Sequence, residues 1–229
     1  MDKLLRGLGD FIRRRRPGLR ATFKRLAHGQ EPVALLLACS DSRIVPSLLL
    51  GSGPGDIFEV RTVGNIIAPA GAGGAASVGD ESEAAALEYA ILALDVKHIV
   101  VMGHSGCGAM KAVLTGHVPE GATNLERWLV HARGASERLA ESALIDRALA
   151  PADRLSQANV LQQLDHIQSY AVVAGRLARG AVELHGAWFD VEQADLHVWN
   201  REQRRFLRAD EAAVAGALAR RASVPRPTS

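Results

Sequence analysis

The chain has 229 residues, of which 48% are hydrophobic and 23% are charged, and its formal net charge is +2. This length suffices for one sizeable domain with its own core, and the composition excludes a disordered chain. The longest apolar run, 33–38, is far shorter than the roughly 20 residues that a membrane-spanning helix needs. We therefore predict one globular domain that does not enter a membrane.

Positive charge is concentrated in residues 1–30, which hold nine basic and two acidic side chains. The segment thus carries a net +7, which leaves about −5 for the rest of the chain. A basic segment can bind nucleic acid or an acidic membrane surface, but charge runs commonly form the solvated face of a helix. We interpret residues 1–30 as an N-terminal helical arm, interrupted at Pro17, that packs on a neighbouring subunit. We predict no nucleic acid partner and no membrane partner.

Apolar and helical patterns alternate through residues 31–223, which we expect to form one domain followed by a short tail over 224–229. The predicted strands cover 33–38, 56–63 and 98–102, with a strand pair over 181–190 and 195–199. The predicted helices cover 82–94 with Ser82 as N-cap, a segment after Cys107, and the long stretches 123–149 and 157–179. This order favours an α/β fold with a mostly parallel central β-sheet flanked by helices. Ligands of such sheets bind beyond the carboxyl ends of the strands.

Each of the two cysteines follows a predicted buried strand. Cys39 comes after 33–38, and Cys107 comes three residues after His104 at the end of the third strand. Two thiolates and one imidazole form a Cys₂His set for a zinc ion with one open position. The alternative is that both cysteines are small core residues beside a hydrogen-bonded histidine. Because no export signal is visible, we expect reduced thiols, no disulfide and a cytoplasmic protein.

Asp41 and Arg43 lie directly after Cys39. A charged pair at the mouth of buried strands is costly unless its members satisfy each other, and the arginine fork suits a carboxylate. The pair is either a structural ion pair or, beside a metal, a carboxylate placed to interact with bound water. These two readings stay open on the residues alone.

The motifs Cys39-Ser-Asp-Ser-Arg43 and His104-x-x-Cys107 resemble the signature of the β-class carbonic anhydrases. The likeness covers nearly the whole chain and is greatest to the plant and cyanobacterial branch, which includes carboxysomal members. Further segments that resemble the family are 28–32, 54–61, 83–89 and 184–190.

The resemblance implies a zinc lyase, carbonate dehydratase, that hydrates CO₂ reversibly to bicarbonate and a proton by means of a zinc-bound hydroxide. It implies one Zn²⁺ per chain on Cys39, His104 and Cys107, with Asp41 and Arg43 as the catalytic dyad. It further implies a homodimer or a higher even-numbered oligomer with the active-site cleft at the dimer interface. The expected compartment is the cytoplasm, with the carboxysome as the alternative.

The same resemblance assigns the substrate pocket to Gln30, Phe58 and Tyr89, with Val63 as a further candidate. Gln30 would donate a hydrogen bond to bicarbonate, and the two aromatic rings would line an apolar pocket for CO₂. On the residues alone, the aromatics could equally be packing residues and Gln30 a surface residue.

Two other functions remain open on the sequence. One is a COS or CS₂ hydrolase of the same fold and metal site. The other is a non-catalytic, zinc-stabilised assembly protein that uses the basic arm. Asp41 and Arg43 favour an enzyme, because a purely structural zinc has no need of them.

Overall fold

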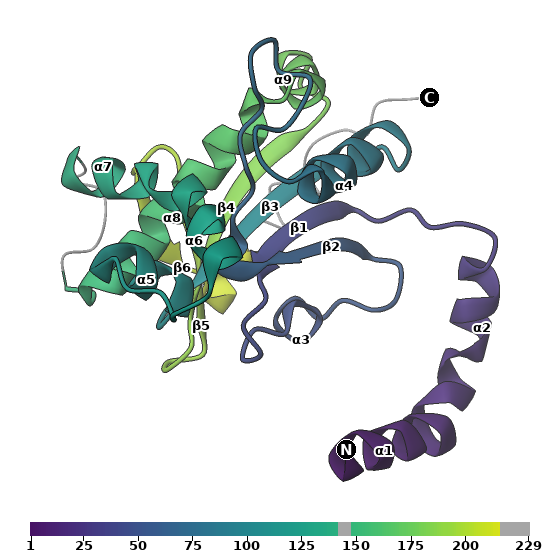
Figure 1. The fold of residues 1–229 in the computed structure, drawn as a ribbon. Helices are drawn as coiled ribbons and strands as arrows, with labels where there is room; N and C mark the ends of the chain where they lie inside the picture. Colours follow the sequence, from purple (N-terminus) through teal and green to yellow (C-terminus); the bar gives the residue numbers. More distant parts are fainter. Residues whose placement is uncertain (142–147, 216–229) are drawn as a thin grey trace.

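A six-stranded sheet forms the centre of the computed structural model, which describes residues 1–141 and 148–215 (Figure 1). The strands are β1 (Ala34–Cys39), β2 (Ile57–Thr62), β3 (His98–His104), β4 (Glu183–Asp190), β5 (Asp195–Asn200) and β6 (Arg205–Arg208). Their order in the sheet is β2-β1-β3-β4-β5-β6; the first four in this order are parallel, and β5 and β6 continue antiparallel. The prediction of an α/β fold with a mostly parallel sheet is therefore confirmed. The tail expected over 224–229 lies outside the described residues.

Helices cover the sheet and form the N-terminal arm. The α-helices are α1 (Asp2–Asp10), α2 (Arg16–Leu26), α3 (Pro46–Leu49), α4 (Glu81–Leu92), α5 (Gly108–Thr115), α6 (Thr123–Leu129), α7 (Gly134–Glu141), α8 (Pro151–Ser169) and α9 (Ala171–Ala178). Within the described part of the chain, none of them is both long and apolar enough to cross a membrane.

The apolar run of β1 is buried on both faces of the sheet, as its sequence predicts. Leu35 and Leu37 pack in the core that the sheet shares with α4, α8 and α9. Leu36 points to the opposite face, where it packs with Met102 of β3 and with Ile44 from the segment before α3. β1 is therefore an interior strand of the sheet, paired with β2 on one side and with β3 on the other.

The winding of the sheet reverses at β1, because β2 lies on one side of it and β3 on the other. Such a reversal opens a crevice beyond the carboxyl ends of the two strands on either side of the switch. Cys39 is the last residue of β1 and His104 the last residue of β3. The fold thus brings both residues to the same edge of the sheet.

The two long helical stretches are more divided than expected. The first consists of α6, a 3₁₀ turn over Val130–Ala132, and α7, and its residues 142–147 lie outside the described chain. The second begins at Pro151, where proline suits the first turn of α8, and it breaks at Tyr170. Tyr170 leaves the helix because its buried hydroxyl donates to the carbonyl of Ala68 at 2.8 Å, so tertiary packing overrides the helical pattern.

Two local expectations are also wrong, and one strand was not expected. The N-cap of α4 is Asp80, whose carboxylate accepts from the amide of Ser82, rather than Ser82 itself. The arm is not interrupted at Pro17: a π-helical turn over Phe11–Arg15 precedes it, and Pro17 lies in the first turn of α2, where an amide donor is not needed. β6 was not anticipated, because it is only four residues long and begins and ends with arginine.

Candidate metal centre and active site

Three ligand-type side chains meet at the carboxyl ends of β1 and β3. The ligand atoms of Cys39, His104 and Cys107 all lie within 4.8 Å of one another, and all three residues are buried. Cys107 reaches this position through a tight turn in which Gly106 has a φ of +63°, a conformation that glycine adopts without strain. The two cysteines and the histidine expected to share a metal are therefore brought together.

The ring of His104 is oriented for a metal. Its Nδ1 lies 2.9 Å from the carbonyl oxygen of Ser105, to which only a protonated nitrogen can donate. Its Nε2 then carries the lone pair, and this buried atom has no hydrogen-bond partner among the described residues. A metal-binding histidine has this arrangement, with one ring nitrogen anchored to a carbonyl and the other free to ligate.

The two thiols share negative charge. A hydrogen bond from the Cys107 thiol lowers the pKa of Cys39, although burial opposes this shift. The pKa of Cys107 is raised, because its proton is held by Cys39 and its site is desolvated. Burial disfavours protonation of His104, but the Cys39 thiolate, the Ser105 carbonyl and the Asp41 carboxylate together outweigh it and raise the pKa of the imidazole. The cluster therefore favours a cation at its centre.

Asp41 and Arg43 form a forked ion pair beside the cluster. Arg43 donates from Nε to Oδ1 at 2.9 Å and from Nη2 to Oδ2 at 2.7 Å, and its backbone amide also donates to Oδ1. These hydrogen bonds hold the pKa of Asp41 well below its usual range, against a smaller effect of burial. The guanidinium is fixed in turn by the carbonyl of Gly106, at 2.9 Å. Asp41 is therefore ionised and held in place from the turn that carries Cys107.

The Asp41 carboxylate stands at the edge of the cluster. Its Oδ2 lies 3.9 Å from Nε2 of His104, and the same oxygen accepts from Arg43. The carboxylate can accept a hydrogen bond from a molecule bound near His104 while Arg43 retains it. The forked ion pair joins two residues of one tight turn. Asp41 and Arg43 must therefore be close in sequence, which explains their spacing.

Arg61 is a supporting residue that the sequence analysis missed. Its guanidinium donates to the carbonyls of Cys39, Asp41 and Ile44, at distances of 2.7 to 3.0 Å from Nη2. It thereby shapes the loop that follows β1. An arginine in a neighbouring strand, whose partners are backbone atoms distant in sequence, shows no pattern that could reveal this role.

The buried polar side of α8 was missed as well. Ser156 donates to the carbonyl of His104 at 2.8 Å, and Asn159 donates to the carbonyl of Gly64 at 2.9 Å. Gln163 accepts from the amide of Ile67 at 2.9 Å. The spacing of these three residues, i, i+3 and i+7, places them on one face of the helix, which was the available signal.

Close approach of α8 to β3 depends on Gly103. A Cβ atom at this position would lie 2.8 Å from Cγ2 of Val160 and 3.1 Å from Oγ of Ser156. Without a side chain there, Ser156 can reach the carbonyl of His104. The packing of one helix on the sheet thus sets the position of a candidate ligand.

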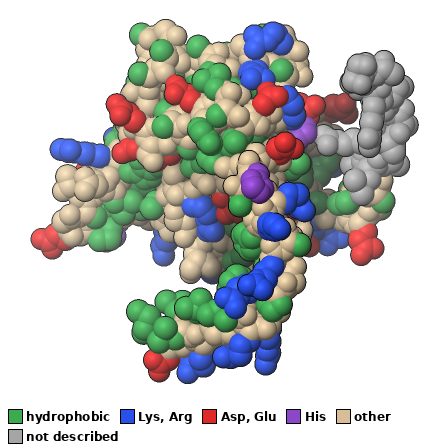
Figure 2. All heavy atoms as spheres, turned by 90° about the vertical axis from the view of Figure 1, so that its right-hand side faces the viewer, with side chains coloured by type: hydrophobic (Ala, Val, Ile, Leu, Met, Phe, Trp, Pro, Cys, Tyr) green, Lys and Arg blue, Asp and Glu red, His purple; other side chains and the backbone are tan. Residues whose placement is uncertain are grey.

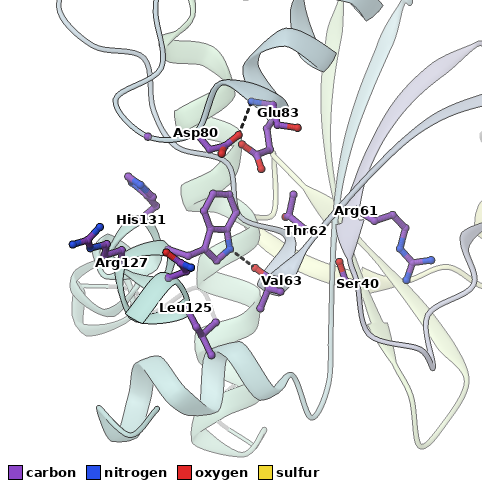
Figure 3. A pocket seen from close by; sticks show the side chains of 13 residues that line it. Ser40, Arg61, Thr62, Val63, Asp80, Glu83, Leu125, Arg127 and His131 are labelled. Atoms are coloured by element: carbon purple, nitrogen blue, oxygen red, sulfur yellow. Dashed lines mark hydrogen bonds between the residues drawn. The ribbon is translucent and has the colours of Figure 1, made fainter. Parts of the chain in front are cut away.

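An open hollow of about 720 Å³ adjoins this centre, lined by Ser40, which follows Cys39, and by residues of α4 and α6 (Figure 3). Thr62 and Val63 lie on one side of it and Arg127 and His131 on the other, and Arg61 also contributes to its lining (Figure 3). The carbonyl of Val63 accepts from the indole of Trp128 at 2.8 Å. Val63, a candidate pocket residue, therefore lines a cavity beside the cluster.

The other three pocket candidates lie elsewhere in the chain. Phe58 and Tyr89 contact each other, with ring centroids 5.9 Å apart. Phe58 is four residues before the end of β2, or about 13 Å along the strand. Gln30 is exposed in the connection between α2 and β1. Within one chain, Phe58 and the Tyr89 ring that contacts it are therefore remote from Cys39, His104 and Cys107.

Comparisons with known proteins agree with this geometry. Residues 34–196 match the family model described as carbonic anhydrase. A carbonic anhydrase from Synechococcus elongatus is 36% identical over 197 residues, which cover 86% of this chain and 70% of the relative. The chain belongs to the β-class carbonic anhydrases.

Solved structures of β-class carbonic anhydrases share the fold. The β-carbonic anhydrase CcaA superposes with a TM-score of 0.80 and 34% identity, over 92% of each chain. One of two tetrameric β-carbonic anhydrases from Sordaria macrospora gives a TM-score of 0.70 and 27% identity, over 86% of this chain and 95% of the other. The match to CcaA therefore spans nearly all of this chain.

Proposed function

We propose that this chain hydrates CO₂ reversibly to bicarbonate and a proton, with one Zn²⁺ held by Cys39, His104 and Cys107. The observation that carries the proposal is the orphaned Nε2 of buried His104, which faces two thiols beside an arginine-held carboxylate. Membership of the β-class carbonic anhydrases supports the reaction. A reducing compartment such as the cytoplasm would keep both thiols available for the metal.

The donor set fits zinc. Zn²⁺ takes thiolate and imidazole ligands in a tetrahedron, and three protein ligands leave the fourth position for water. When bound, Zn²⁺ would lower the pKa of that water so that it can attack CO₂ near neutral pH. Because Cys39 and Cys107 would cancel the charge of the ion, the water should be less acidic than in a site with neutral ligands.

Asp41 and Arg43 act on the attacking water in this proposal. Asp41 accepts a hydrogen bond from the water and so orients its lone pair toward CO₂. Arg43 keeps both carboxylate oxygens engaged, which would keep Asp41 from becoming a metal ligand. The fork at 2.7 and 2.9 Å, anchored on Gly106, supports an open site at rest.

A second subunit completes the substrate pocket. Phe58 pairs with Leu35 in the sheet, about 13 Å along the strands from Cys39, and Tyr89 contacts Phe58. Gln30 is exposed, and Tyr89 is 50% exposed. In a homodimer or a higher even-numbered assembly, these side chains line the active site of the other subunit, while Val63 serves its own. The tetrameric relatives from Sordaria macrospora support an even-numbered assembly.

The N-terminal arm supports the same assembly. It projects from the body of the protein, and Figure 2 shows hydrophobic side chains along one side of it and Lys and Arg along the other. Leu4 is 71% exposed, and Leu5 and Leu8 are also exposed. An amphipathic helix exposed in this way needs an apolar surface, which a neighbouring subunit supplies. Removal of residues 1–28 should shift the sedimentation profile to smaller species; an unchanged profile would count against this role.

Stopped-flow CO₂ hydration, with zinc quantified on the same sample, tests the proposal. We expect turnover that scales with zinc content and reaches its maximum near one ion per chain. Sulfide release from COS or CS₂, measured in parallel, separates the hydrolase alternative, which predicts faster release than CO₂ hydration. Bound zinc with no hydration would favour a non-catalytic assembly protein and contradict the proposal.

A further inference from the structure

A second group of ligand-type side chains lies at the opposite end of the sheet, where β3 and β4 begin. His98 pairs directly with Glu183 in the parallel register, and His185 is two residues further along β4. Alternate residues of a strand point to the same face, so Glu183 and His185 project together beside His98. Their ligand atoms all lie within 4.8 Å of one another.

The distances within this group suit a metal ion. Nδ1 of His98 lies 3.1 Å from Nε2 of His185, and Oε2 of Glu183 lies 3.8 Å and 3.6 Å from these two nitrogens. In a tetrahedron with metal–ligand bonds of about 2.0 to 2.1 Å, neighbouring ligand atoms are about 3.3 Å apart. Shifts of a few tenths of an ångström in these partly exposed side chains would bring all three atoms onto one ion.

We propose that His98, Glu183 and His185 form a second metal site, for a divalent ion of the Zn²⁺ and Ni²⁺ type, with water in the remaining positions. Two imidazoles and one carboxylate suit such first-row ions, whereas Mg²⁺ and Ca²⁺ prefer ligand sets of oxygen alone. The inference does not rest on the proposed function, because it uses none of the residues of the thiol cluster.

The surroundings indicate an exchangeable ion. The side chains of His98, His185 and Glu183 are 25%, 36% and 61% exposed, so the ion would remain in contact with solvent. Binding would replace the contact between the two imidazoles. Arg201, which donates to the carbonyl of Leu184, lines the adjoining hollow and adds positive charge nearby. The ion should therefore be held less tightly than one on two buried thiolates.

Binding would link the starts of two neighbouring strands. A ligand that binds only the folded state stabilises it in proportion to its occupancy. The thermal unfolding temperature of the protein should therefore rise with added metal, provided that all three side chains are present.

The test uses full-length, tag-free protein whose catalytic site is loaded with zinc. NiCl₂ is titrated by isothermal calorimetry into the wild type, His185→Ala and Glu183→Gln, and zinc retention is measured after each titration. His117→Ala, which removes an exposed histidine outside the group, is the matched control. We expect one Ni²⁺ per chain in the wild type and the control, with zinc retained, and binding at least about tenfold weaker in the other two variants.

Two further readouts keep the test decisive. Added Co²⁺ should give a spectrum without the charge-transfer absorption of a thiolate ligand, which separates this site from the cysteines. Added Ni²⁺ should raise the unfolding temperature of the wild type but not that of Glu183→Gln, a conservative change at an exposed position that leaves folding intact. Equal Ni²⁺ affinity in all four proteins, or weak non-stoichiometric uptake by the wild type, would overturn the proposal.

Discussion

The two ends of β3 carry ligand-type histidines in opposite settings. His104, at the carboxyl end, is fully buried and faces two thiols, whereas His98, at the amino end, is part-exposed and faces an imidazole and a carboxylate. The buried end has its ring fixed by a backbone carbonyl and its loops fixed by Arg61 and α8. Ligand chemistry alone therefore does not make a catalytic centre, because orientation and exclusion of water come from the surrounding fold.

The largest expected effect concerns His104. His104→Ala removes the one neutral ligand of the thiol cluster, so we expect CO₂ hydration to fall by more than about 100-fold together with loss of zinc. Stopped-flow rates and metal analysis measure both. His117→Ala is the control and should retain both properties. Full activity in His104→Ala would contradict a catalytic role for the cluster at the carboxyl end of β3.

The second-largest expected effect is a fall in kcat on substitution of Arg43. Arg43→Ala releases Asp41, whose carboxylate can then occupy the fourth metal position, so kcat should fall by about 10- to 100-fold while zinc is retained. Arg43→Lys should recover only part of the rate, since an ammonium cannot form the fork. A structure of Arg43→Ala with water on zinc, at wild-type rate, would contradict this role.

The pH dependence of the rate should differ from that of a site with neutral ligands. Arg43 holds the pKa of Asp41 well below its usual range, so Asp41 stays ionised throughout the neutral and alkaline range. A rise in kcat/KM above neutral pH must then come from the water held by a thiolate-rich site. We expect an increase of about tenfold between about pH 7 and about pH 9, measured by stopped flow. A flat profile would show that the thiolates do not set the acidity of the water.

The smallest expected effect is on the free energy of unfolding and concerns His166 of α8, the helix that packs behind the carboxyl end of β3. Burial lowers the pKa of His166, whose Nδ1 lies 2.7 Å from the carbonyl of Ile67. A lowered native pKa stabilises the fold above the unfolded pKa of about 6.5, and this contribution is lost as the pH falls below it. The free energy of unfolding should therefore decrease from pH 7.5 to pH 5.5 by less in His166→Gln than in the wild type, as measured in urea. An identical decrease in both proteins would assign the acid sensitivity to other groups.

Sequence patterns predicted the parts of the fold that depend on burial and local chemistry. The apolar run of β1, the strand that begins at His98 and the hairpin of β4 and β5 follow from periodicity alone. The break at Tyr170 and the short strand β6 do not, because long-range packing and pairing with a neighbour decide them.

The candidate site was predictable to a similar degree. Cys39 and His104 are the last residues of their strands, which a sheet of this topology brings to one edge, and Cys107 follows His104 in the next turn. The role of Arg61 was not predictable, because it acts on backbone carbonyls that only the fold places near it. The group at His98 was overlooked for another reason: its members are single polar residues at strand starts, where sequence patterns expect solvated side chains.

The missing side chain at Gly103 has a mechanical consequence. α8 holds three points of the active-site edge at once: the carbonyls of His104 and Gly64 and the amide of Ile67. A methyl group at Gly103 would push α8 away from β3. The three backbone groups that α8 holds by hydrogen bonds would then shift together. The close contact between α8 and β3 at Gly103 therefore helps to set the geometry beside the thiols.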